Sequence, residues 1–188
     1  MNEELFWQLI DKARSAPNAN FETQCVTLTE YLLAYTEEEI ITFEEILREK
    51  IEEASSWRTM AASFVVRSFI SDDEYEDFRA WLVGQGKTNF HKVLRDPNEI
   101  CNILKPGQVK DMHGEYMLFV AVNAYLEKTD SDDDEAFYEK IEHPEEKEIV
   151  QTWPESKQEY RNLFPRLYDT FWNEKRIEER LEEAENEE

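Results

Sequence analysis

The sequence contains little glycine and proline and almost no cysteine: 4 Gly, 6 Pro and 2 Cys in 188 residues. Glycine and proline supply the tight turns of sandwiches and barrels, so their scarcity disfavours an all-β fold. Cys25 and Cys101 can form at most one bridge, which disfavours a disulfide-stapled secreted domain. We therefore expect free thiols in a reducing cytoplasm.

Basic residues are also scarce: 21 Lys and Arg stand against 44 Asp and Glu, a formal net charge of -23. Such a surface repels a phosphate backbone and anionic lipids, so we expect neither nucleic-acid nor membrane binding. No apolar run approaches the ~20 residues that a membrane span needs. Residues 1–4 (MNEE) lack the basic start of a secretory signal, which again favours a cytoplasmic protein.

The chain nevertheless has enough apolar material for a core, since 40% of its residues are hydrophobic and 13% are aromatic. Its length favours a single domain. The acids are concentrated in residues 129–150, which hold ten acids and two bases, and in residues 174–188. We predict a helical core over 1–128, an acidic linker or loop over 129–150, an aromatic segment docking on the core over 151–173, and an acidic tail helix over 174–188 that frays.

Apolar residues recur at helical spacing along most of the chain, and no convincing alternating strand is present. The first such face contains Leu5, Phe6, Leu9, Ile10 and Ala13. The sequence therefore predicts an all-α multi-helix bundle of about seven to nine helices.

Two capping boxes mark helix starts. In each, the hydroxyl of the first residue accepts the amide N–H three residues on, and the Glu at that position reaches back. They begin at Thr36, with Glu39 as the partner, and at Ser71, with Glu74. We expect helices to begin at these two positions.

Three segments carry a resemblance to a known family: Phe6–Ile10 (FWQLI), Ser71–Gly86, and the region from Glu115 to Tyr125. The chain resembles an uncharacterised bacterial family of small helical proteins, a domain of unknown function with an FWxLI opening and an SDDxFxxFRxWLxxxG-like centre. The resemblance spans roughly residues 2 to 128. It implies an α-helical bacterial protein and brings no activity with it.

Asp72, Asp73, Arg79 and Glu115 are the candidate catalytic residues. Adjacent carboxylates can hold a divalent cation or act as acid and base. The structural alternative is stronger, because acids in the first turn of a helix are stabilised by the macrodipole. Arg79 lies two helical turns after Asp72, so we expect it to bridge to Asp72 or to Glu115.

Five residues are candidate binding residues: Trp7, Trp57, Arg58, Trp81 and Tyr116. Aromatic side chains dominate pockets and interfaces, which favours a ligand cleft. The alternative is that aromatic residues at helical spacing belong to the core.

No sequence pattern indicates a metal or cofactor. His91, His113 and His143 are scattered, without metal-ligand spacing. The acidic run 130–135 lacks the glycine and terminal glutamate of a calcium loop. Nucleophile-elbow and phosphate-loop motifs are also absent from the sequence. We predict no metal and no cofactor.

The sequence favours a non-catalytic acidic protein-binding module of a bacterial cytoplasm. Anionic surface speeds the encounter with a cationic partner, so the partner is expected to be a basic protein. An immunity-like inhibitor and a regulator of an enzyme are two forms of this function. The alternative is a hydrolase or metal-dependent enzyme that uses Asp72, Asp73, Arg79 and Glu115. The oligomeric state stays open.

Overall fold

A computed structural model describes residues 1–17, 20–149 and 153–187 of the chain. These residues form helices joined by loops, with no strand among them, which confirms the all-α prediction. The longer helices are α1 (Glu3–Arg14), α2 (Phe21–Leu32), α3 (Glu37–Glu53), α4 (Trp57–Arg67), α5 (Asp72–Gly84), α6 (Lys87–Arg95), α9 (Val120–Thr129), α11 (Lys157–Leu163), α12 (Pro165–Phe171) and α13 (Glu174–Glu187).

The predicted count of seven to nine helices is too low. The shorter elements are η1 (Pro97–Glu99), α7 (Ile100–Ile103), η2 (Pro106–Asp111), α8 (Glu115–Leu118) and α10 (Glu135–Tyr138). A four-residue helix spans little more than one turn, too short for a periodic pattern to appear in the sequence. The apolar run after Met112 also divides into α8 and α9 at Phe119.

Both predicted capping boxes are present. At the start of α3 the Glu39 amide N–H donates to Thr36 Oγ1 at 3.2 Å, and the Thr36 amide donates to Glu39 Oε2 at 3.0 Å. At α5 the Glu74 and Ser71 pair makes the same two bonds at 3.2 and 3.3 Å. These bonds satisfy amide groups that have no partner inside the helix.

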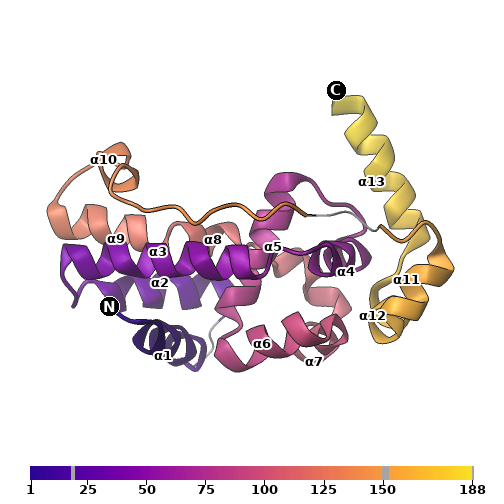
Figure 1. Ribbon diagram of the computed structural model, residues 1–188, viewed down its shortest axis with the longest axis horizontal. Helices are drawn as coiled ribbons and strands as arrows, with labels where there is room; N and C mark the ends of the chain where they lie inside the picture. The colour runs from indigo at the N-terminus through magenta and orange to yellow at the C-terminus, as the bar shows by residue number, and fades with distance from the viewer. Residues whose placement is uncertain (18–19, 150–152, 188) are drawn as a thin grey trace.

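The helices form an elongated body in which α5 lies near the middle (Figure 1). On one side of it, α2 packs on α1 and α9, and α3 packs on α9 and α5. On the other side, α4 packs on α12. One contiguous core runs through both halves, with wholly buried aromatic rings at Phe6, Phe43, Phe78, Phe90 and Phe164.

The aromatic segment that follows the acidic stretch packs on α4 as α11 and α12. The Phe64 and Tyr160 rings are stacked with centroids 5.5 Å apart. Phe164 and Leu167 are completely buried. Burying a side chain of this size contributes about 2 kcal/mol, which holds the two short helices in place.

The acidic stretch is partly ordered by contacts with the core. Phe137 of α10 is fully buried and Ile141 nearly so. Beyond them the chain runs extended along α3 (Figure 1), where the Lys147 amide donates to Glu52 Oε1 at 2.6 Å. The stretch predicted as a loop therefore contains one short helix and two buried anchors. Residues 150–152 and 188, which fall in the predicted loop, docking segment and tail, lie outside the described residues.

The C-terminal helix α13 projects from the body (Figure 1). Its Arg180 Nη2 lies 2.9 Å from Glu74 Oε1 at the start of α5. Within the described residues, no helix combines the length and apolar character needed to cross a bilayer.

Candidate functional site

The structure does not gather the four candidate catalytic residues. Asp72 and Asp73 are exposed in the first turn of α5, and Glu115 is exposed at the start of α8. Asp72 and Arg79 both line a hollow of about 510 Å³, but Asp73 and Glu115 are not among its lining residues.

Arg79 bonds to α3, so the expected bridge to Asp72 or Glu115 is replaced by other contacts. Its Nη1 lies 3.6 Å from Glu52 Oε2 and donates to the Ile51 carbonyl at 3.4 Å. Its guanidinium lies 4.5 Å from the centroid of the Tyr75 ring. Helix α5 is packed between α3 and α8, and Arg79 lies on the side facing α3. Glu115 belongs to the helix on the other side.

Metal-ligating side chains are dispersed as well. In the described part of the chain, no three His, Cys, Asp or Glu side chains lie close enough to hold a metal ion. Cys25 is a buried free thiol, and burial raises its pKa to about 12. Such a thiol stays protonated at neutral pH and is a poor nucleophile.

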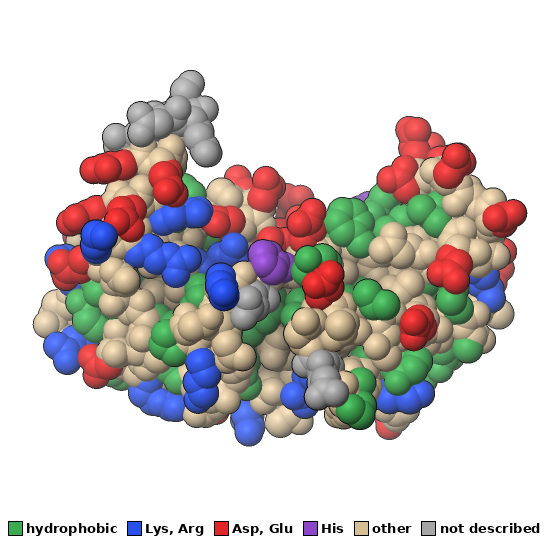
Figure 2. Space-filling model, turned by 180° about the vertical axis from the view of Figure 1, so that it is seen from behind, with side chains coloured by type: hydrophobic (Ala, Val, Ile, Leu, Met, Phe, Trp, Pro, Cys, Tyr) green, Lys and Arg blue, Asp and Glu red, His purple; other side chains and the backbone are tan. Residues whose placement is uncertain are grey.

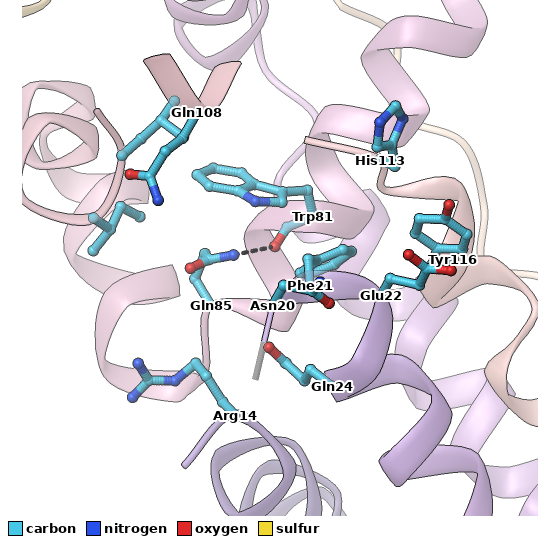
Figure 3. Close-up of a pocket in the computed structure, with 12 residues that line it drawn as sticks. Arg14, Asn20, Phe21, Glu22, Gln24, Trp81, Gln85, Gln108, His113 and Tyr116 are labelled. Carbon is cyan, nitrogen blue, oxygen red and sulfur yellow. Dashed lines mark hydrogen bonds between the residues drawn. The ribbon is translucent and has the colours of Figure 1, made fainter. Parts of the chain in front are cut away.

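A cleft of about 600 Å³, which we call the central cleft, is shown in Figure 3. It lies among α1, α2, α5, α7, η2 and α8. Its lining residues are Arg14, Asn20, Phe21, Glu22, Gln24, Trp81, Gln85, Ile103, Leu104, Gln108, His113 and Tyr116. A volume of this size is typical of small-molecule sites.

Two glycines let the helices around the central cleft approach each other closely. A Cβ atom on Gly84 would lie 2.4 Å from the Phe21 ring, so the glycine lets α2 begin directly against α5. A Cβ atom on Gly114 would lie 1.7 Å from the carbonyl oxygen of Asp77. The absence of both methyl groups thus places Phe21 on one side of the cleft and His113 and Tyr116 on another.

Trp81 and Tyr116 are the two predicted binding residues that line the central cleft. Trp7 is buried in the core, where its Nε1 donates to Glu3 Oε1 at 3.1 Å. Trp57 and Arg58 lie at the start of α4, with the Arg58 guanidinium 6.0 Å from the Phe164 ring centroid. These three residues are absent from the cleft lining.

The amide side chains of the central cleft are not among the residues predicted from the sequence. No repeating pattern in the sequence marks Asn20, Gln85 or Gln108. These polar side chains reach the cleft only because of the way the helices pack together. Gln24 offers one usable signal. It is a polar residue directly before the apolar residue Cys25 of α2. In the structure its side chain is buried, with 4% exposed.

Beside the central cleft is a surface that we call the acid-rimmed face, formed by α2, α8 and α9. It exposes three large hydrophobic residues, Val26, Tyr116 and Phe119, which are 55%, 39% and 45% exposed. Helices α2 and α9 are in contact, and Thr29 Oγ1 donates to the Val120 carbonyl at 3.3 Å. The exposed acids on the same helices are Glu22, Glu30, Glu115 and Glu127.

Figure 2 shows hydrophobic side chains gathered on the half of the molecule that contains α2, α8 and α9, on the right in this view, with acidic side chains around and between them. Glu22 and Tyr116 also line the central cleft, and their side chains lie close together in Figure 3. The acid-rimmed face and the mouth of the cleft are therefore continuous.

One carboxylate is buried away from both surfaces. Glu44 on α3 is 0% exposed, and Arg48 Nη2 lies 2.7 Å from its Oε1. Burial raises the pKa of Glu44 to about 7, and the nearby Arg48 opposes that shift only in part. Glu44 is therefore a buried group that titrates near neutral pH.

A sequence profile described as "Protein of unknown function (DUF4240)" matches residues 1–127. The match confirms the resemblance to a domain of unknown function, over almost the same residues that carried the motifs. Neither the curated proteins nor the solved structures contain a match to this chain.

Proposed function

The chain belongs to the DUF4240 family of proteins of unknown function, and from this premise we propose that it is a non-catalytic protein-binding module for a basic partner. The observation that carries the proposal is the acid-rimmed face. Of the four large hydrophobic residues that are exposed in the described chain, three lie there and the fourth, Leu181, lies on α13.

The side chains of the acid-rimmed face are better suited to contact with a protein partner than to exposure to water. Aromatic residues at an interface carry much of the binding energy, and Tyr116 and Phe119 are exposed aromatic residues of this kind. The four exposed glutamates of these helices attract positive charge and accelerate association with a cationic surface. An amphipathic helix with an apolar stripe and basic flanks fits this arrangement.

The alternative enzymatic function has no support from the geometry. Asp73 and Glu115 are separated from the hollow that Asp72 and Arg79 line, and Arg79 is engaged by Glu52. A binding function in a bacterial cytoplasm requires no such cluster. The proposal has two concrete forms, an immunity-like inhibitor and a regulator of an enzyme.

The test is affinity capture at about 50 mM salt, followed by measurement of the dissociation constant for the purified captured protein. We expect a basic protein whose affinity falls as salt is raised, because exposed charges are screened. Phe119→Ser should weaken binding about tenfold or more, since it removes an aromatic group from the face.

Leu181→Ser is the matched control, because Leu181 is 47% exposed and lies on α13. It should bind like the wild type. Equal affinity of wild type and Phe119→Ser for the captured protein, or capture of acidic proteins only, would overturn the proposal.

A further inference from the structure

We propose that the central cleft is a binding site for an uncharged saccharide, a function distinct from the protein binding proposed for the acid-rimmed face, with which the cleft shares Glu22 and Tyr116. Four amide side chains line the cleft: Asn20, Gln24, Gln85 and Gln108. In each of them one polar atom is held by the protein, and the other is left for a ligand.

Two of the amides present an N–H donor. Asn20 Oδ1 accepts the Thr23 amide at 2.8 Å, which leaves its Nδ2 without a partner among the described residues. Gln108 Oε1 accepts the Lys105 amide N–H at 3.2 Å, and Gln108 Nε2 likewise has no partner among the described residues. Because the oxygen of each amide accepts a hydrogen bond, a flip that exchanges the oxygen and nitrogen positions would break that bond.

The other two amides present a carbonyl acceptor. Gln24 Nε2 donates to the Gly84 carbonyl at 2.7 Å, and Gln85 Nε2 donates to the Trp81 carbonyl at 3.3 Å. Their Oε1 atoms have no donor within the described part of the chain. The cleft thus offers fixed donors and fixed acceptors together. A hydroxyl group both donates and accepts, so a ligand rich in hydroxyl groups satisfies both kinds.

Aromatic rings add an apolar surface beside these amides. Trp81 forms part of the inner wall but is only 4% exposed, so the half-buried Phe21 ring and Tyr116 supply most of the accessible aromatic surface (Figure 3). Tyr116 is 39% exposed at the edge and lies edge-on to His113, with ring centroids 5.8 Å apart. A pyranose ring has one face of C–H groups that packs on such rings while its hydroxyl groups reach the amides.

The charges of the cleft favour a neutral ligand. Arg14 and Glu22 are its two permanently charged lining residues, of opposite sign, and they lie on different sides of the hollow in Figure 3. An anionic ligand would also meet the field of a chain with a formal net charge of -23. A mono- or disaccharide avoids both penalties and fits within about 600 Å³.

The experiment is a binding screen of the full chain against a broad glycan array, with titration of the best uncharged saccharide by calorimetry. We expect saturable binding of one or more mono- or disaccharide groups. Gln85→Leu and Gln108→Leu each remove one hydrogen-bonding group, and each should weaken binding about fivefold. Gln108 is exposed, so that substitution leaves the core intact.

Gln158→Leu on the exposed face of α11 is the matched control and should bind like the wild type. Thermal melting of each variant separates lost binding from lost folding. The proposal fails if no glycan binds the folded wild type, if Gln85→Leu and Gln108→Leu bind the glycan unchanged, or if the screen ligands are displaced by a nucleoside or a free amino acid.

This outcome is separable from the test of the acid-rimmed face. Phe119→Ser should retain saccharide binding, because Phe119 does not line the cleft. Gln85→Leu should retain affinity for a captured protein partner, because Gln85 lies outside the acid-rimmed face.

Discussion

Replacing Glu44 with glutamine should make the protein more resistant to rising pH. Glu44 is completely buried, and burial raises its pKa to about 7, whereas the carboxyl of an unfolded chain titrates near its ordinary value of 4.5. Between these two values the folded state binds a proton that the unfolded state has released. The free energy of unfolding therefore falls as pH rises from about 4.5 to about 7.

The size of the effect follows from the shift. One pKa unit corresponds to about 1.4 kcal/mol, so the Glu44 carboxyl should remove about 3 kcal/mol of stability between pH 4.5 and pH 8. Below the unfolded-state pKa the contribution is fully present, and it is lost as pH passes through the folded-state pKa. Glutamine has nearly the same shape and does not titrate, so the variant should lack this loss.

The assay is urea unfolding of wild type and Glu44→Gln at pH 5 and pH 8, with the difference between the two proteins taken at each pH. Other acids titrate in both proteins and cancel. The variant should gain between about 2 and 3 kcal/mol relative to wild type on going from pH 5 to pH 8, slightly less than over the full interval from pH 4.5. Glu49→Gln, exposed on the same helix, is the control and should show no such gain. A difference for Glu44→Gln that is the same at both pH values would refute the reasoning.

Two further substitutions test the packing that shapes the central cleft and the α4–α5 region. Gly114→Ala should destabilise the protein by about 3 kcal/mol, because the added methyl meets the Asp77 backbone, which cannot swing away. Gly107→Ala, with open space around the position, should be nearly neutral in the same denaturant titration, and equal effects would contradict the assigned contact. Tyr75→Phe should cost about 1 to 2 kcal/mol, since the Tyr75 hydroxyl accepts the Ser56 amide at 3.0 Å and contacts Thr59 Oγ1 in a buried network. Tyr35→Phe is the comparison, because the Tyr35 hydroxyl has no hydrogen-bond partner among the described residues; a cost no larger for Tyr75→Phe would show that the network is dispensable.

The helical class and several helix starts were predictable because they depend on short-range physics. The spacing of Phe6, Leu9 and Ile10 places them on one side of a helix, and all three are buried in α1. The Thr36 and Ser71 caps involve residues three positions apart. Such interactions close within one turn, so the chain itself brings the partners together.

The helix count and the position of Arg79 were not predictable in the same way. One-turn helices such as α7 and α8 are stabilised by packing and carry no periodic signal of their own. Arg79 was expected beside Asp72 or Glu115, but it bonds to α3 because α5 packs with that side against Glu52. Helical spacing gives the face on which a residue lies, whereas the partner of that face is set by the arrangement of other helices.

The amino-acid sequence thus determined the local order of the molecule, its acidic surface and its membership in a family of helical proteins. Tertiary structure alone decided which side chains meet. It brought the amides at α2, α5 and η2 around one cleft, and it packed α2 against α8 and α9. The physical reason is distance along the chain: Gln24 and Gly84 are sixty residues apart, and only close packing at a glycine joins them.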